Sequence, residues 1–299
     1  MLSVLIPTFN YDCSELVEKL CQEGCRLQNG FELIVGDDAS TDQAVISALD
    51  RLQTLPGVMV VHNSENLGRA AGRNQMARQS KGDILFFIDA DALVPDDFSL
   101  QAGLDAIRDA DVVCGGLRHP AVNPCPKATL RFKYEKEADK SRSAEIRSQT
   151  PYHQISTFSL MVRRDVFLSI LFDEQCREYG YEDTLFGAEL EKRGAKVVHI
   201  DNPLVHNGLE PNDVYLKKTE QALHTLKRLE PLMVDHSRLL QAVGKLRRQH
   251  LAWLAALVFK SIRRPLRRNL LGPNPSLKAF AFYKLGYFLT LKADKHTES

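Results

Sequence analysis

The chain has 299 residues, which is enough for one large α/β domain with an appendage or for two modest domains. Its 44% hydrophobic and 26% charged residues exclude a disordered or fibrous chain. The net charge of +1 hides an asymmetry, because residues 213–299 hold 17 Lys and Arg against 6 Asp and Glu and the rest of the chain is acidic. We therefore expect cations beside the carboxylates of the first part and an anionic partner for the second.

The cysteines and the apolar runs predict in which cellular compartment the protein works. The six cysteines form no CxxC pair, so we expect reduced thiols in a cytosolic protein. The chain enters an apolar run at once, without a basic region or a cleavage site, so we expect no signal peptide. The longest apolar run, residues 251–259, is far shorter than the ~20 residues that span a bilayer.

Five short apolar runs predict strands of a mostly parallel sheet, at residues 2–6, 31–35, 58–61, 84–88 and 112–114. They do not alternate and helical patterns separate them, which indicates a sheet covered on both faces. Polar loops follow three of them: Thr8-Phe9-Asn10, Asp37-Asp38 and Asp89-Ala90-Asp91. Because ligands bind at the carboxyl ends of such strands, we expect the site there.

The other predicted elements complete an α/β fold with a helical C-terminal extension. We expect helices starting with a cap at Asp12, at Thr41 or Asp42, at residue 70, after Pro95 and at Glu182. Residues 117–154 predict a polar connection or a surface helix, and residues 155–162 and 197–200 predict further strands. We expect one large domain at 1–210, with a first half at 1–116 and a second half at 117–210, and a basic helical extension at 211–299.

Asp89 and Asp91 are the strongest single feature of the sequence. Two carboxylates one residue apart at a strand end can share one divalent cation, and oxygen ligands suit Mg²⁺ or Mn²⁺. The competing interpretation is a helix cap plus a solvated loop acid. His206 could add a neutral imidazole ligand, although a lone histidine is more often structural. We assign no role to the other histidines.

Three further groups of residues have both a functional and a structural interpretation. The Asp37-Asp38 pair can accept hydrogen bonds from a base or ribose, or can cap the following helix. Asn66, Gly68 and Arg73 can approach a phosphate, or can belong to a helix surface. One carboxylate of Glu182-Asp183 can act as a general base, or both can favour the helix start through its dipole.

Taken in order, five motifs resemble the family 2 glycosyltransferases with the GT-A fold. They are Ile6-Pro7-Thr8-Phe9-Asn10, Val35-Gly36-Asp37-Asp38-Ala39-Ser40-Thr41-Asp42, Asn66-Leu67-Gly68 with Arg73-Asn74, Asp89-Ala90-Asp91 and Glu182-Asp183. Each motif is short, but all five follow the expected order over residues 2–210. Ala39, where the family often has Gly, and Ala92, where it often has Asp, depart from its pattern.

The resemblance implies an inverting transfer of a sugar from a nucleotide-diphosphate sugar, usually a UDP-sugar, to a hydroxyl. It makes residues 1–210 the catalytic domain, with a nucleotide-sugar half at 1–116 and an acceptor half at 117–210. It places a nucleotide-sugar pocket at Pro7, Thr8, Asn10, Asp38, Asn66, Gly68, Arg73 and Asp89. It implies Mn²⁺ or Mg²⁺ on Asp91, with Asp89 and His206 close by. Asp183 matches the family's catalytic base, with Glu182 as its neighbour.

Three alternatives differ in chemistry. A sugar-phosphate nucleotidyltransferase would need a Gly-rich, Arg-containing loop after the first strand, and a dinucleotide oxidoreductase would need GxGxxG there, but the sequence has Pro7-Thr8-Phe9-Asn10. A catalytically degenerate GT-A scaffold is the third alternative, and the presence of Asp91 and Asp183 argues against it.

The C-terminal extension combines basic and aromatic residues at helical spacing. Residues 245–268 hold eight Lys and Arg around Leu251, Trp253, Leu254, Leu257, Val258 and Phe259. Such a helix suits an anionic membrane surface, but it could equally pack on the catalytic domain with a solvated basic face. No nucleic-acid motif accompanies the charge. Peripheral contact at the inner face of the membrane would suit a lipid-linked acceptor, such as one in bacterial surface polysaccharide synthesis.

Overall fold

The computed structural model describes residues 1–174 and 180–292. The chain divides into two compact units. Among these residues, the sheet unit comprises 1–120, 139–174 and 182–208, and the helical unit comprises 121–138, 180–181 and 209–292. The helical unit resumes at Leu209, beside the expected boundary at 210. It also includes residues 121–138, which we expected in the acceptor half.

A seven-stranded mixed sheet forms the centre of the sheet unit, with the strand order β3-β2-β1-β4-β8-β6-β9. Its strands are β1 Leu2–Thr8, β2 Phe31–Asp37, β3 Val58–His62, β4 Ile84–Ile88, β6 Val112–Cys114, β8 Ser159–Arg163 and β9 Val197–His199. The pairs β4–β8 and β6–β8 are antiparallel, and the other pairs are parallel. The carboxyl ends of β1, β2 and β4 therefore meet at one edge, as predicted.

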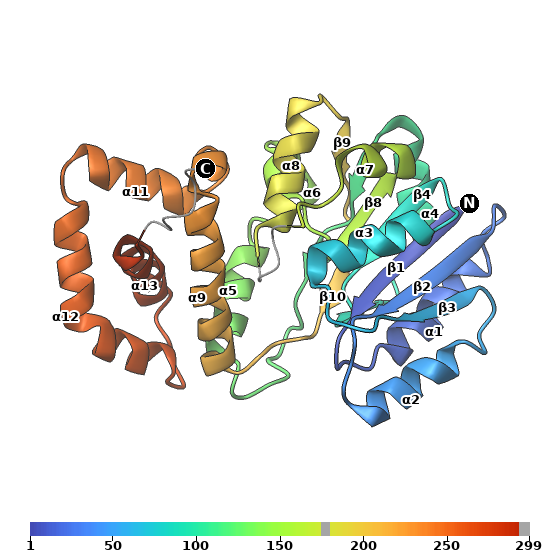
Figure 1. Ribbon diagram of the computed structural model, residues 1–299, viewed down its shortest axis with the longest axis horizontal. Helices are drawn as coiled ribbons and strands as arrows, with labels where there is room; N and C mark the ends of the chain where they lie inside the picture. Colours follow the sequence, from blue (N-terminus) through green and yellow to red (C-terminus); the bar gives the residue numbers. More distant parts are fainter. Residues whose placement is uncertain (175–179, 293–299) are drawn as a thin grey trace. The chain divides into compact units, whose positions relative to one another are not determined.

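Helices cover both faces of this sheet. The helices of the sheet unit are α1 Ser14–Gly24, α2 Gln43–Leu52, α3 Arg69–Gln79, α4 Leu100–Ala106, α6 Ala144–Ser148, α7 Arg164–Ile170 and α8 Glu182–Lys192, with 3₁₀ turns at Ile107–Asp109 and Pro151–Gln154. One buried apolar cluster joins the sheet to α1, α2 and α4, and a second joins it to α3, α7 and α8. The strands run between these two sets of helices (Figure 1).

A second, three-stranded sheet has the order β5-β10-β7. It consists of β5 Ala92–Leu93, β10 Leu204–His206 and β7 Leu117–Arg118. The antiparallel register of β5 and β10 sets His206 opposite Ala92, immediately after Asp91. This small sheet therefore brings two predicted site residues together.

The helical unit has its own apolar core. Its helices are α5 Thr129–Asp139, whose last residue belongs to the sheet unit, α9 Asn212–Arg228, α10 Glu230–Met233, α11 Arg238–Arg248, α12 Ala252–Leu270 and α13 Leu277–Thr290. The core is built from Leu130, Leu216, Phe259, Leu270, Phe280 and Tyr283. The helical pattern expected after Asn212 is therefore confirmed.

Several predicted element boundaries were wrong. Asp12 does not cap α1, because its carboxylate accepts from the Ser14 amide and hydroxyl in the turn before the helix. The helix expected after Pro95 begins at Leu100, where the Ser99 side chain caps it. The strand expected from residue 155 begins at Ser159. By contrast, the predicted cap at Asp42 is confirmed by its bonds to the Ala44 and Val45 amides.

Five of the six cysteines lie among the described residues, and all five are free thiols; Cys176 lies outside the described part. Over residues 1–174 and 180–292, no helix combines the length and apolarity that crossing a bilayer requires.

Candidate active site

The end of β1 is joined to the loop after β2 by Asn10. The Asn10 side-chain oxygen accepts hydrogen bonds from the backbone amides of Thr41 at 2.8 Å and Asp42 at 3.1 Å. The backbone amide of Asn10 donates to the Ser40 hydroxyl at 2.7 Å. The Asn10 backbone has φ 49°, a left-handed conformation that Asn tolerates. Beside it, the Thr8 hydroxyl donates to the Tyr11 carbonyl at 2.8 Å. Both predicted residues therefore shape the loops above β1 and β2.

The Asp38 carboxylate holds the loop that precedes α3. It accepts from the Asn63 side chain at 3.1 Å, from the Leu67 amide at 2.8 Å and from the Gly68 amide at 2.9 Å. Gly68 has φ 83°, which favours glycine at this turn. The Asn66 side chain donates to the Asp38 carbonyl. Asn66 and Gly68 thus both contact Asp38, and the contact of these three residues with a nucleotide sugar stays a prediction.

The neighbouring Asp37 has a structural role. It is 2% exposed, accepts from the Ser40 amide, and lies 2.7 Å from Nδ1 of His62. This hydrogen bond to Asp37 raises the pKa of His62.

Asp91 and His206 form a pair of potential metal ligands. The His206 Nε2 lies 3.2 Å from Asp91 Oδ2, and the Asn207 amide donates to the Asp91 carbonyl. Gly208 lies against the same carboxylate, since a Cβ on Gly208 would stand 1.9 Å from Asp91 Oδ2. An oxygen and a nitrogen donor at this spacing suit a divalent cation such as Mn²⁺.

Aromatic rings fix the position of the His206 imidazole. It packs edge-on against Phe158, with ring centroids 5.2 Å apart, and against His119 at 5.3 Å. His119 Nδ1 in turn lies 2.9 Å from the Asp139 carboxylate. The sequence indicates no role for His119, because the pairing of β7 with β10 that brings it to His206 leaves no local pattern.

Arg73 is a buried cation between two carboxylates. Its side chain is 1% exposed, and its guanidinium lies 2.5 Å from Asp89 and 3.6 Å from Glu182. We expected Arg73 at a phosphate, but this burial ties it instead to the strand end and to the start of α8. Arg73 contacts Asp89 through Oδ1, and a cation contact of Asp89 stays a prediction that rests on its second carboxylate oxygen.

Asp183 has the properties of a general base. Its Oδ2 accepts from the Thr157 amide at 3.2 Å, and its buried Oδ1 has no hydrogen-bond partner among the described residues. Burial, followed by the neighbouring Glu182 charge, raises the pKa of Asp183 to about 7, while the Arg73 charge opposes this shift. A carboxylate poised near neutral pH and not saturated with donors can accept a proton from a bound hydroxyl.

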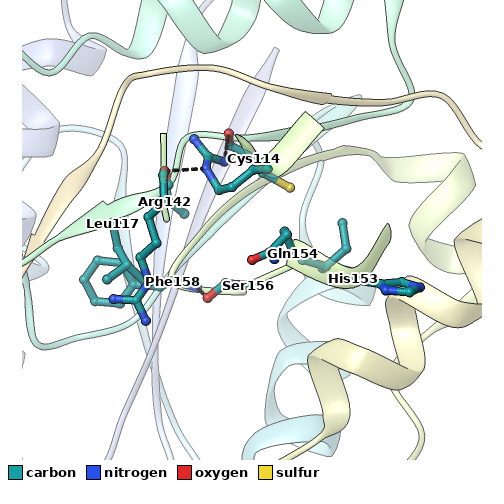
Figure 2. Close-up of a pocket in the computed structure, with 11 residues that line it drawn as sticks. Cys114, Leu117, Arg142, His153, Gln154, Ser156 and Phe158 are labelled. Atoms are coloured by element: carbon teal, nitrogen blue, oxygen red, sulfur yellow. Dashed lines mark hydrogen bonds between the residues drawn. The ribbon is translucent and has the colours of Figure 1, made fainter. Parts of the chain in front are cut away.

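The sheet unit contains a cavity of about 200 Å³, and none of the predicted site residues is among those that line it. It is lined by Cys114, Gly116, Leu117, Arg142, Arg147, His153, Gln154, Ile155, Ser156, Phe158 and Ser159. Phe158 contacts the His206 ring, and Ser156 precedes the amide that binds Asp183. Figure 2 shows Leu117, Arg142 and Phe158 together at one end of the cavity and His153 at the other.

A protein-family comparison decides the class of this site. The model of Glycosyl transferase family 2 matches residues 3–170, more than half of the chain. The chain belongs to glycosyltransferase family 2. This confirms the resemblance drawn from the five motifs, and this glycosyltransferase is therefore an enzyme with a GT-A-type fold.

Two curated relatives are also named as glycosyltransferases. An uncharacterized glycosyltransferase of Haemophilus influenzae is 38% identical over 93 residues, and the uncharacterized glycosyltransferase YfnE of Bacillus subtilis is 37% identical over 97 residues. These matches cover 30% and 32% of this chain, and 29% and 24% of the relatives. The chain therefore matches less than a third of the length of either relative.

Solved structures share the fold of this glycosyltransferase. A mannosyltransferase from Pyrobaculum calidifontis, in complex with GDP-Man and Mn²⁺, has a TM-score of 0.60 at 17% identity over 96% of this chain and 84% of its own. Residues 1–349 of S. aureus TarS, in complex with UDP, have a TM-score of 0.53 at 17% identity over 96% and 89%. At 17% identity, these similarities show that the proteins share a fold.

Proposed function

We propose that this glycosyltransferase transfers a sugar, with inversion, from a nucleotide-diphosphate sugar, in the first instance a UDP-sugar, to a hydroxyl of the acceptor. The observation that carries this proposal is the Asp183 carboxylate, whose buried Oδ1 has no hydrogen-bond partner in residues 1–174 and 180–292. UDP and UDP-GlcNAc in the TarS structures and GDP-Man in the mannosyltransferase support a nucleotide-sugar donor.

The residues present fit a divalent cation. Asp91 and His206 offer an oxygen and a nitrogen at 3.2 Å, and a side chain at position 208 would displace the Asp91 carboxylate. The mixed donor pair favours Mn²⁺ over Mg²⁺, which prefers oxygen ligands. A bound cation would supply the positive charge that stabilises a departing diphosphate.

The Asp183 carboxylate performs the proton transfer in this proposal. In its ionised form Asp183 accepts the acceptor's hydroxyl proton through Oδ1 while the hydroxyl oxygen forms the new bond to the anomeric carbon. The bond between that carbon and the diphosphate oxygen breaks in the same displacement, so the configuration inverts. Arg73 supports this step indirectly, because its charge favours the ionised form of Asp183.

We further propose a glycan or lipid-linked acceptor in bacterial surface polysaccharide synthesis. In this proposal the enzyme works in the cytoplasm, peripheral to the inner face of the membrane. The basic, aromatic-rich helical unit supports this location, and the bacterial origin of both curated relatives supports the biological setting.

Release of UDP from UDP-sugars in the presence of Mn²⁺ tests the proposal. We expect donor-dependent release by the wild type and its loss in Asp91→Ala and Asp183→Asn. A panel of uridine and guanosine diphosphate sugars identifies the donor by thermal stabilisation. Release that persists in both variants would overturn the assignment of the site.

A further inference from the structure

Helix α12 carries an exposed apolar face. Trp253 is 67% exposed, Leu254 41%, Leu257 53% and Val258 42%. At about 100° per residue these four side chains span roughly 140° of the helix circumference. Four large apolar residues on one exposed face differ from singly scattered ones and mark an interaction surface.

This face points away from the core of the helical unit. Phe259 is 1% exposed and packs against Tyr283, with ring centroids 5.3 Å apart, and against Gly286 of α13. In the wheel of α12, Phe259 and the buried Leu270 lie on the side opposite to the four exposed residues. The helix is thus anchored on one side, and its other side is free for a partner.

The same helix is strongly basic. Its five charged residues are Lys260, Arg263, Arg264, Arg267 and Arg268, and it contains no Asp or Glu. Arg263 is engaged by Glu220 at 3.8 Å and by the Tyr287 ring at 5.3 Å. In the described part of the chain, no carboxylate forms an ion pair with the other four. Arg264 and Arg268 lie on the same side of α12 as the four apolar residues, nearer to the C-terminal end of the helix.

We propose that α12 docks this glycosyltransferase on a membrane surface that contains acidic phospholipids. Trp253, Leu254, Leu257 and Val258 enter the interface between headgroups and acyl chains, and Arg264 and Arg268 bind lipid phosphates. A helix that lies in the interface combines these two features. A second copy of the chain is a poorer occupant, because it would bring two sets of five cations together.

Trp253 provides a direct reporter, since it is the single tryptophan of the chain. The full chain is titrated with vesicles of phosphatidylcholine alone, and of phosphatidylcholine with phosphatidylglycerol. We expect a blue shift of the emission and co-sedimentation with the acidic vesicles, both reversed by high salt. This inference rests on the membrane location in the proposed function and assigns it to α12. Because the vesicle test contains neither donor nor acceptor, vesicle binding can fail while UDP release persists, and the reverse.

Matched variants separate the two parts of the surface. Leu257→Ser with Val258→Ser removes apolar contact, and Arg264→Gln with Arg268→Gln removes charge. Each double variant should bind acidic vesicles at least ~10-fold more weakly. The controls are Leu232→Ser, 60% exposed in α10, and Lys217→Gln with Arg238→Gln, exposed in α9 and α11. These controls should bind like the wild type.

Three results would overturn the proposal. The first is no blue shift with acidic vesicles. The second is equal binding by the wild type and both double variants. The third is self-association in sedimentation velocity that Leu257→Ser with Val258→Ser abolishes, without vesicle binding, which would assign the face to a second copy.

Discussion

The Arg73 guanidinium lies 2.5 Å from the Asp89 carboxylate, and the arginine side chain is 1% exposed. The same guanidinium lies 3.6 Å from Glu182, the residue before the proposed base. Arg73 therefore links the carboxyl end of β4 to the first turn of α8, and its charge offsets two acids that are close to Asp183.

Replacing Arg73 by Met should destabilise the fold. The variant removes the cation beside Asp89, while Glu182 keeps Arg69 at 3.8 Å. Removing one partner of a buried ion pair costs about 3–5 kcal/mol. Urea unfolding at neutral pH measures this loss. Arg78→Met is the matched control on the same helix, because Arg78 is about half exposed and its pair with Glu174 contributes at most about 1 kcal/mol. Equal losses in the two variants would contradict this role of Arg73.

Asp183 should make both activity and stability depend on pH. Its pKa is raised from 3.8 to about 7, so the base becomes ionised, and kcat/KM rises, as the pH passes through neutrality. The folded state prefers the protonated form, so the stability contribution of this group is lost as pH rises from about 4 to about 7. Asp183→Asn should remove transfer and stabilise the protein above neutral pH by on the order of 2–4 kcal/mol, but not at pH near 4. Activity against pH and thermal unfolding at several pH values test this, and a flat rate profile in the wild type would contradict it.

Gly208→Ala should damage cation binding more than folding. The new Cβ would stand 1.9 Å from Asp91 Oδ2 and would push the carboxylate away from His206. Mn²⁺ affinity, followed by electron paramagnetic resonance, should fall at least ~10-fold, as expected when a ligand is misplaced. Gly72→Ala is the control, because a Cβ at Gly72 meets nothing within 4 Å and Ala favours a helix interior. Unchanged Mn²⁺ affinity in Gly208→Ala would remove Asp91 from the metal site.

His206→Gln separates the imidazole from the carboxylate. The change keeps a polar side chain of similar size but removes the nitrogen that lies 3.2 Å from Asp91. Mn²⁺ should bind at least ~10-fold more weakly, and Mg²⁺ should be affected less, because it prefers oxygen ligands. His62→Gln is a control on a histidine that pairs with the structural Asp37. Equal effects on the two ions would indicate that His206 acts only through packing.

The strand ends of the site could be predicted from the sequence because their signals are local. Short, mainly apolar runs that end within three residues of Thr8, Asp38 or Asp89 place these residues at one edge of a parallel sheet. The parallel pairing of β1 with β2 and β4 confirms this. The start of α8 at Glu182 was equally readable from its pattern.

The burial of Arg73 and the surroundings of His206 could not be predicted. An arginine in a polar segment of α3 has the sequence pattern of a surface cation, and its partners Asp89 and Glu182 come from other elements. His119 reaches His206 only because two-residue strands pair across the chain, and such strands leave no period to detect.

The cation requirement of nucleotide binding tests the central claim most directly. UDP is titrated calorimetrically into the wild type and Asp91→Ala, with Mn²⁺ and with a chelator. The proposed site predicts that Mn²⁺ raises the affinity of the wild type for UDP at least ~10-fold. It predicts that Mn²⁺ leaves the affinity of Asp91→Ala for UDP unchanged. Equal UDP affinity of the wild type with Mn²⁺ and with the chelator would contradict a diphosphate held through a cation at Asp91.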